Sequence, residues 1–173
     1  MAVMCSTEKN ENQHIMIRKY KSTDSEKVVA TWNHAFRLAH PFLKAEYVEK
    51  VKVDMGNIYL PNSETWVYEE IETILGFVCL LVIEIGGLFI LPSHHGKGIG
   101  TQLLDYVHQF HEELEVEVFE KNKIGIPFYH KYGFELLKSY FHEETQQVML
   151  RMKHSRIEYN RSSLTSRLFQ LQA

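Results

Sequence analysis

The stretch that decides the fold spans residues 88–107 and reads LFILPSHHGKGIGTQLLDYV. The apolar run at its start stops at Pro92, because proline has no N–H to donate to a strand ladder. Three glycines follow at alternate positions, and apolar residues then recur at helical spacing. The stretch therefore predicts a strand, a glycine loop and a helix in direct succession.

The glycine loop is predicted to bind a phosphate or pyrophosphate group. The first turn of a helix presents free backbone N–H groups and the positive end of the helix dipole at one point. The dinucleotide fingerprint GxGxxG does not fit, because Leu103 stands where its third glycine would be, and GxxxxGK[ST] does not fit either. These mismatches argue against a common nucleotide-phosphate loop. A tight turn whose glycines serve only the backbone conformation stays open as an alternative.

The composition is that of one ordinary globular domain. The 173 residues are 45% hydrophobic and 24% charged, which does not indicate disorder. A net charge of −3 gives no basic patch for nucleic acid, and no apolar run is long enough for a membrane helix. Cys5 and Cys79 are predicted to be unpaired, which fits a cytoplasmic protein. The adjacent His94 and His95 lack further ligands, so no metal is expected.

Hydrophobic periodicity and turn residues divide the chain into alternating strands and helices, typical of an α/β or α+β sandwich. Strands are expected at residues 15–20, 65–68, 74–81, 84–91, 114–119, 134–141 and 147–152. Helices are expected from the caps at 22–24 to Pro41, and at 42–59, 100–112 and 124–132, with a loop over MGNIYLPNSE at 55–64. Gly86 and Gly87 inside one strand indicate a bulge or the close approach of another backbone or of a ligand.

The domain organisation follows from changes in composition. Residues 1–14 form a polar, flexible leader, and residues 15–153 form the folded domain. The tail at 154–173 is rich in serine and arginine, and either a short docking helix or disorder fits its composition.

A second motif, NKIGIPFYHKYGF at residues 122–134, follows the strand after the glycine helix. GCN5-related N-acetyltransferases (GNAT superfamily) carry Q/R-x-x-G-x-G/A and then N-x-x-A-x-x-[FL]-Y-x-x-x-G-F. The positions that match are Gly98, Gly100, Asn122, Phe128, Tyr129, Gly133 and Phe134. His95 replaces the usual Gln or Arg, and Gly125 replaces the usual Ala. The chain resembles this superfamily over residues 15–152, and within it the small bacterial-type acetyltransferases.

The resemblance implies a mixed central sheet of about six to seven strands, mostly antiparallel, flanked by about four helices. A splay is expected between the strands that carry residues 88–90 and 114–119. The implied activity is acetyl-coenzyme A-dependent N-acetylation of a primary amine, on a small molecule or on a peptide or protein, by direct attack in a ternary complex. The alternative is a non-catalytic sensor or scaffold that binds an acyl-coenzyme A. The presence of Tyr129 favours the enzyme.

The resemblance also implies roles for particular residues. Tyr129 would protonate the departing thiolate, and Glu84 would take the proton of the amine directly or through water. An N–H of Leu88 or Phe89 would polarise the thioester carbonyl, and Asn122 would bind the pantetheine arm. A carboxylate on the solvent face of a strand remains the alternative for Glu84. The full set implied to bind the coenzyme is Leu88, Phe89, Ile90, His95, Gly96, Lys97, Gly98, Ile99, Gly100, Thr101, Asn122, Phe128 and Tyr129.

The amine acceptor is not identified by the sequence. Its candidate contacts are Trp32, His40, Phe42 and Trp66. Aromatic residues at helical spacing more often belong to a core, and a histidine at a helix end often interacts with the helix dipole. Cys79, inside an apolar strand, is expected to be inert. A homodimer is left open.

Overall fold

The computed structural model describes residues 15–156, so the expected leader at 1–14 and the tail beyond residue 156 lie outside the described residues. Seven strands form one sheet in the order β1-β2-β3-β4-β5-β7-β6. They are β1 (Ile15–Lys19), β2 (Glu64–Glu70), β3 (Thr73–Leu81), β4 (Glu84–Ile90), β5 (Glu113–Phe119), β6 (Glu135–His142) and β7 (Gln147–Ser155). Neighbouring strands are antiparallel except β4 and β5, which are parallel. The predicted mixed, mostly antiparallel sheet is confirmed.

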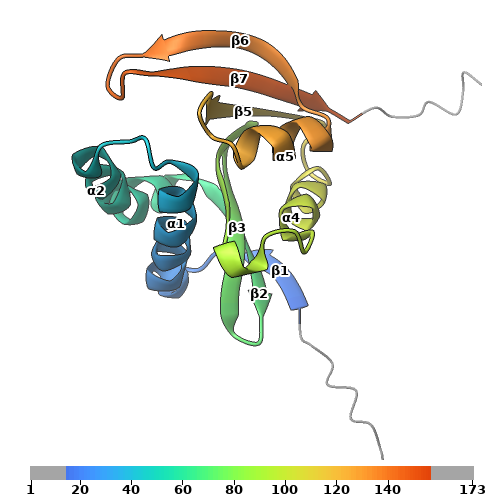
Figure 1. The fold of residues 1–173 in the computed structure, drawn as a ribbon. Helices are drawn as coiled ribbons and strands as arrows, with labels where there is room; N and C mark the ends of the chain where they lie inside the picture. The colour runs from blue at the N-terminus through green and yellow to red at the C-terminus, as the bar shows by residue number, and fades with distance from the viewer. Residues whose placement is uncertain (1–14, 157–173) are drawn as a thin grey trace, which may run out of the picture.

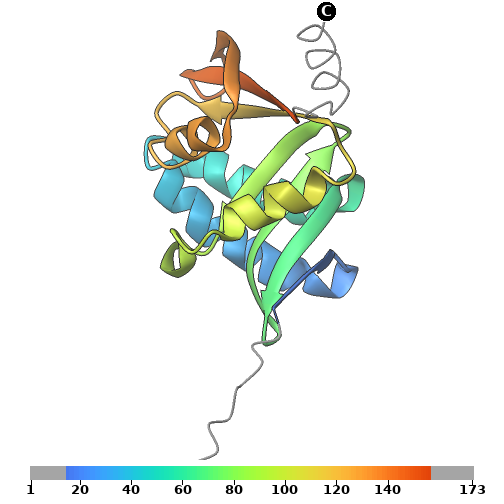
Figure 2. The ribbon, with the colours of Figure 1, turned by 90° about the vertical axis from the view of Figure 1, so that its right-hand side faces the viewer.

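Helices cover both faces of this sheet (Figures 1 and 2). They are α1 (Ser25–Ala39), α2 (Ala45–Asp54), α3 (Leu60–Asn62), α4 (Ile99–Val107) and α5 (Gly125–Tyr132). Helices α1 and α2 share one apolar cluster with β2 and β3, whereas α4 and α5 share another with β3, β4 and β5. The buried positions of α1 recur every three or four residues, for example Val28, Trp32 and Phe36, as the periodicity predicts. Among residues 15–156, none of the helices could cross a lipid bilayer.

The sheet splays open between β4 and β5. These strands pair only at Glu84 with Glu115 and at Ile85 with Val116, whereas β5 pairs with β7 along its whole length. The register of β4 against β3 also shifts by one residue, so that Gly86 is the extra residue of a bulge. Both the predicted splay and the predicted bulge are confirmed, and within residues 15–156 they leave one edge of β4 without a partner strand beyond Ile85.

The loop predicted over residues 55–64 is wrong. The backbone continues from α2 through a π-helical turn, η2 (Met55–Tyr59), into α3. Pro61 lies in the first turn of α3, where its missing N–H costs no hydrogen bond. Met55 and Leu60 are buried, so packing against the sheet holds this segment in a helical conformation.

Other boundaries also differ from the prediction. Helix α2 begins at Ala45 rather than at residue 42, and α4 ends at Val107 rather than at residue 112. After α4 the imidazole Nδ1 of His108 hydrogen-bonds the carbonyl of His111 at 2.9 Å, in a turn that leads into β5. Strand β7 reaches Ser155, because it pairs with β5 up to Glu113, and so extends two residues into the predicted tail.

Candidate functional site

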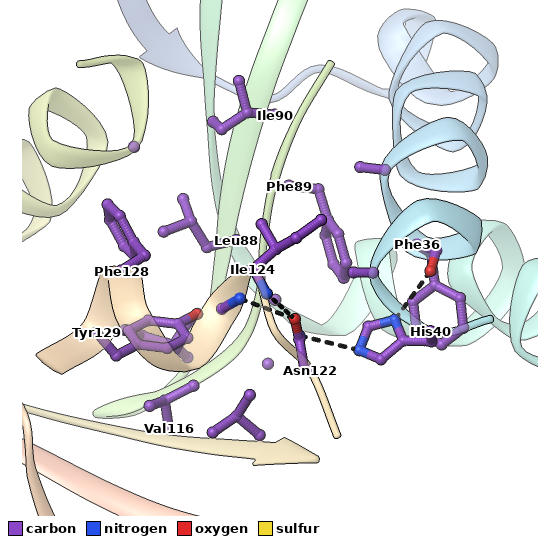
Figure 3. Close-up of a pocket in the computed structure, with 18 of the residues that line it drawn as sticks. Phe36, His40, Leu88, Phe89, Ile90, Val116, Asn122, Ile124, Phe128 and Tyr129 are labelled. Carbon is purple, nitrogen blue, oxygen red and sulfur yellow. Dashed lines mark hydrogen bonds between the residues drawn. The ribbon is translucent and has the colours of Figure 1, made fainter. Parts of the chain in front are cut away.

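A cavity of about 960 Å³ opens where β4 and β5 separate. One side is formed by β4, the glycine loop and α5, and the other by α1 and the segment from α2 to η2 (Figure 3). All the residues predicted to bind the coenzyme line this cavity except Lys97, whose exposed side chain lies outside it. Tyr129 and Glu84, predicted to carry the chemistry, line it as well.

The free edge of β4 presents backbone groups to the cavity. Leu91 N–H donates to the Leu75 carbonyl of β3 at 2.8 Å, and backbone groups along an antiparallel strand alternate in direction. The N–H and C=O of Phe89 therefore face β3, whereas those of Leu88 and Ile90 face the cavity. Of the two N–H groups considered for the thioester carbonyl, only that of Leu88 is suitably directed. The imidazole Nε2 of His95 donates to the Ile90 carbonyl at 3.0 Å and ties the loop to this strand.

The glycine loop has the shape of an anion cradle. Gly96 and Gly98 have φ of +77° and +82°, a conformation that residues with a Cβ rarely adopt. Gly98 is the N-cap of α4, so the N–H groups of the first turn have no partner within the helix. At Gly100 a Cβ would lie 3.1 Å from the Phe128 ring. These glycines keep side chains out of the space beside the helix N-terminus, which fits a bound pyrophosphate.

Tyr129 projects from α5 into the cavity (Figure 3). Its side chain is buried, and this burial raises the pKa of the phenol above its ordinary value of 10. The hydroxyl therefore stays protonated at neutral pH, as a proton donor requires. Helix α5 ends at Gly133, whose φ of +111° allows the left-handed C-terminal stop that the sequence predicts.

Asn122 and His40 contact each other across the cavity from Tyr129 (Figure 3). Asn122 Nδ2 lies 3.2 Å from His40 Nε2, and Asn122 Oδ1 accepts hydrogen bonds from the N–H groups of Ile124 and Gly125. His40 Nδ1 lies 2.9 Å from the Phe36 carbonyl. Burial lowers the pKa of His40 to about 4, although the hydrogen bond to Phe36 opposes this shift.

We expect the protein to become less stable as the pH falls below 6.5, because of His40. The unfolded imidazole takes up a proton near its ordinary pKa of 6.5, whereas the folded one does so only near 4. Below pH 6.5 the unfolded state therefore binds more protons than the folded state. Between pH 7 and pH 5 this difference lowers the free energy of unfolding by about 2 kcal/mol. The lowered pKa of His154 acts in the same direction. Urea unfolding of the wild type and of His40→Gln at both pH values measures the effect, which should be smaller in the variant. An equal pH dependence in both proteins would contradict it.

Glu84, Glu115 and Glu117 form an acidic wall on β4 and β5, and two of them, Glu84 and Glu117, line the cavity. Arg151 of β7 binds three carboxylates, with Nη2 to Glu84 at 2.9 Å, Nε to Glu115 at 2.7 Å and Nη1 to Glu117 at 3.1 Å. Tyr140 donates its hydroxyl to Glu117 at 2.6 Å, and burial followed by this bond raises the pKa of Tyr140 to about 12. Three carboxylates share one guanidinium, so the wall carries net negative charge.

Glu117, Tyr140 and Arg151 are not predicted from the sequence as parts of the site. The alternation in LEVEVF does place its glutamates on one face of β5, but nothing local links them to Arg151, at least 34 residues away. The same is true of Tyr47, Val51 and Tyr59, which line the cavity from α2 and η2. Tyr47 and Val51 lie within the helix predicted at 42–59, but nothing in the local pattern shows that this helix faces the cavity.

The residues proposed for the acceptor separate into two groups. Trp32 and His40 line the cavity, with Trp32 wholly buried in its wall. Phe42 does not line it and packs edge-on against Phe119. Trp66 is on the opposite side of the sheet, stacked on Phe110, so its assignment to the acceptor site is wrong. The alternation of β2 side chains, with Val67 in the α1 cluster, turns Trp66 toward α4.

A cysteine nucleophile and a metal site are the two other kinds of site considered for the described residues. Burial raises the pKa of the Cys79 thiol to about 12, so a thiolate nucleophile is not available there. Within residues 15–156, no three His, Cys, Asp or Glu side chains are grouped as metal ligands would be.

The sequence is similar to those of known N-acetyltransferases. Residues 61–136 match the model of the Acetyltransferase (GNAT) domain. The chain is 33% identical over 132 residues to peptidyl-lysine N-acetyltransferase YiaC of Escherichia coli, covering 76% of this chain and 90% of the relative. It is 32% identical to peptidyl-lysine N-acetyltransferase YjaB of the same organism, covering 70% and 83%.

Solved structures have the same fold. The solution structure of apo YjaB from Escherichia coli superposes with a TM-score of 0.74 at 27% identity, covering 83% of this chain and 99% of that one. PaiA N-acetyltransferase from Thermoplasma acidophilum, solved with coenzyme A, superposes with a TM-score of 0.68 at 21% identity, covering 81% and 99%.

Proposed function

The chain belongs to the GCN5-related N-acetyltransferase (GNAT) family, and we propose that it transfers the acetyl group of acetyl-coenzyme A to the side-chain amine of a lysine in a peptide or protein. The observation that carries this proposal is the cavity between β4 and β5. It brings a free strand edge, a glycine cradle and the Tyr129 hydroxyl to one opening.

The residues of the cradle and the strand edge suit the coenzyme. When bound, acetyl-coenzyme A supplies a thioester for attack by an amine and a thiolate leaving group. The N–H groups at the start of α4 would bind the pyrophosphate, and the free edge of β4 would hold the pantetheine arm. Leu88 N–H would donate to the thioester oxygen and stabilise the negative charge that develops there.

Two side chains would move the protons. Tyr129 would donate its phenolic proton to the departing sulfur, because its side chain lines the cavity and its hydroxyl is protonated at neutral pH. Glu84 would take the proton of the attacking amine through water, since Arg151 already binds one of its carboxylate oxygens. No nucleophile from the protein is required, which agrees with the inert Cys79.

The acceptor class is assigned from the charge of the acidic wall and from the names of the relatives. A lysine ammonium is attracted to the wall of Glu84, Glu115 and Glu117, which carries more carboxylates than Arg151 can balance. The names of the two Escherichia coli relatives, both peptidyl-lysine N-acetyltransferases, support the same acceptor class.

Replacing Glu84 with glutamine is expected to lower kcat/KM for the lysine acceptor by about tenfold at neutral pH. The loss is smaller than for a base in direct contact, because water can still reach the amine. Steady-state kinetics with varied peptide measures it. Glu113→Gln is the matched control, because Glu113 lies on the neighbouring strand β5, is bound by Lys153, and does not line the cavity. Equal rates in the wild type and Glu84→Gln would remove this role.

Release of free thiol from acetyl-coenzyme A tests the proposed function. An N-terminally blocked peptide with one lysine should accelerate release, and the same peptide with norleucine should not. Small polyamines serve as the competing acceptor class. Acceleration by polyamines alone would overturn the peptide acceptor, and acceleration by no amine would overturn the activity.

We also propose a cytoplasmic location, which the unpaired thiol of Cys79 supports. Cell fractionation tests this. The homodimer left open by the sequence stays a prediction, which light scattering on the purified chain would test.

A further inference from the structure

A chain of hydrogen bonds connects α1 to α5 across the splay (Figure 3). It runs from the Phe36 carbonyl to His40 Nδ1 at 2.9 Å, and from His40 Nε2 to Asn122 Nδ2 at 3.2 Å. Asn122 Oδ1 then accepts from Ile124 N–H at 3.1 Å and from Gly125 N–H at 2.7 Å. These two N–H groups lie at the start of α5, which carries Tyr129 one turn later.

The hydrogen-bond partners determine where each proton lies in this series of hydrogen bonds. The Phe36 carbonyl only accepts, so His40 Nδ1 carries the hydrogen and Nε2 presents a lone pair. The N–H groups of Ile124 and Gly125 only donate, so Asn122 must turn its oxygen toward them and its amide nitrogen toward His40. If His40 were doubly protonated, its Nε2–H would face the amide N–H of Asn122, and no hydrogen bond could form between them. The neutral imidazole is therefore the form that fits, in agreement with its lowered pKa.

The surroundings hold this arrangement in place. His40 and Asn122 are only 8% and 7% exposed, and the ring of Phe119 packs edge-on against the imidazole at 5.5 Å. Gly125 stands where the family motif has alanine, and a Cβ there would lie 2.8 Å from Asn122 Nδ2. The missing side chain thus leaves room for the amide to reach His40.

We propose that His40 is a positioning residue for acetyl transfer, which holds Asn122 as the cap of α5 and so sets the place of Tyr129 in the cavity. This proposal rests on the proposed role of Tyr129. It reassigns His40 from the acceptor groove, because the Nε2 lone pair is already occupied by Asn122. Asn122 keeps one amide hydrogen that can still bind a pantetheine oxygen.

Two substitutions of His40 separate its two bonds. His40→Asn keeps a donor near the position of Nδ1 but removes the acceptor that faces Asn122. His40→Gln places an amide oxygen near the position of Nε2 and keeps that acceptor. We expect His40→Asn to lower kcat by about fivefold, because the loss of one helix cap costs about 1 kcal/mol. KM for acetyl-coenzyme A should change little. His40→Gln should restore kcat to within about twofold of the wild type.

Amide exchange measures the cap independently of activity. Exchange at Ile124 and Gly125 should accelerate in His40→Asn by a factor similar to the decrease in kcat, and remain near the wild-type rate in His40→Gln. Equal losses of kcat in both variants, or unchanged exchange in His40→Asn, would overturn the proposal.

Long-range ¹H–¹⁵N NMR of the wild type provides a test that needs no variant. It should find His40 neutral with the proton on Nδ1, and a proton on Nε2 would overturn the proposal even if neither variant folds. If the wild type acetylated no amine, the proposed function would fail. The exchange and NMR results would still decide whether His40 holds Asn122.

Discussion

Replacing Tyr129 with phenylalanine is expected to lower kcat for acetyl transfer by about 100-fold, the low end of the range for a positioned acid. The substitution removes one hydroxyl and keeps the ring that packs against Phe128 and Phe134. KM for acetyl-coenzyme A should change little, because the hydroxyl is assigned to the leaving sulfur and not to ground-state binding. Thiol release under saturating acceptor measures kcat.

Tyr132→Phe is the matched control for this loss. Tyr132 lies on the same helix, but it donates its hydroxyl to Asp105 at 2.8 Å. We expect its kcat to stay within about threefold of the wild type. If Tyr129→Phe kept the wild-type kcat, or if both variants lost activity equally, Tyr129 would not be the acid.

Replacing Gly98 with valine is expected to weaken coenzyme A binding by about 10- to 100-fold. A β-branched residue at a φ of +82° carries strain of about 1–2 kcal/mol, and the loop must shift to relieve it. Such a shift moves the N–H groups assigned to the pyrophosphate, and each charge-assisted hydrogen bond contributes about 1.5–3 kcal/mol. Isothermal titration with coenzyme A measures the change.

Gly56→Ala is the control for glycine replacement. Gly56 lies in the η2 turn with no positive φ, and an added Cβ would meet its nearest neighbour at an ordinary 3.8 Å. Binding should match that of the wild type, and stability should rise slightly. Unweakened binding in Gly98→Val would contradict the assignment of the cradle.

The sequence predicted the parts of the site that depend on local patterns. The glycine loop, the bulge at Gly86 and the strand-to-helix order around Tyr129 each depend on residues close together in the chain. The splay followed from the family resemblance. The turn between β3 and β4 was located correctly, although Val82 and Ile83 are not residues typical of turns. Val82 adopts a φ of +61° there.

The parts that could not be predicted depend on how distant segments pack. Asn122 and His40 are 82 residues apart, and only the packing of α1 beside the start of α5 brings them together. The helical path through Gly56 and Pro61 contradicts local propensity because buried apolar residues hold it. Trp66 was misplaced because alternation fixes the two faces of a strand but not which helix covers each face.

The central claim is that this chain acetylates lysine side chains, and mass spectrometry of a single-lysine peptide tests it most directly. The peptide, blocked at its N-terminus, is incubated with acetyl-coenzyme A and with the wild type or Tyr129→Phe, and its fragments are sequenced. The account predicts one added acetyl group on the lysine Nε with the wild type, and far less with Tyr129→Phe. A peptide no more acetylated with the wild type than without any protein would contradict it.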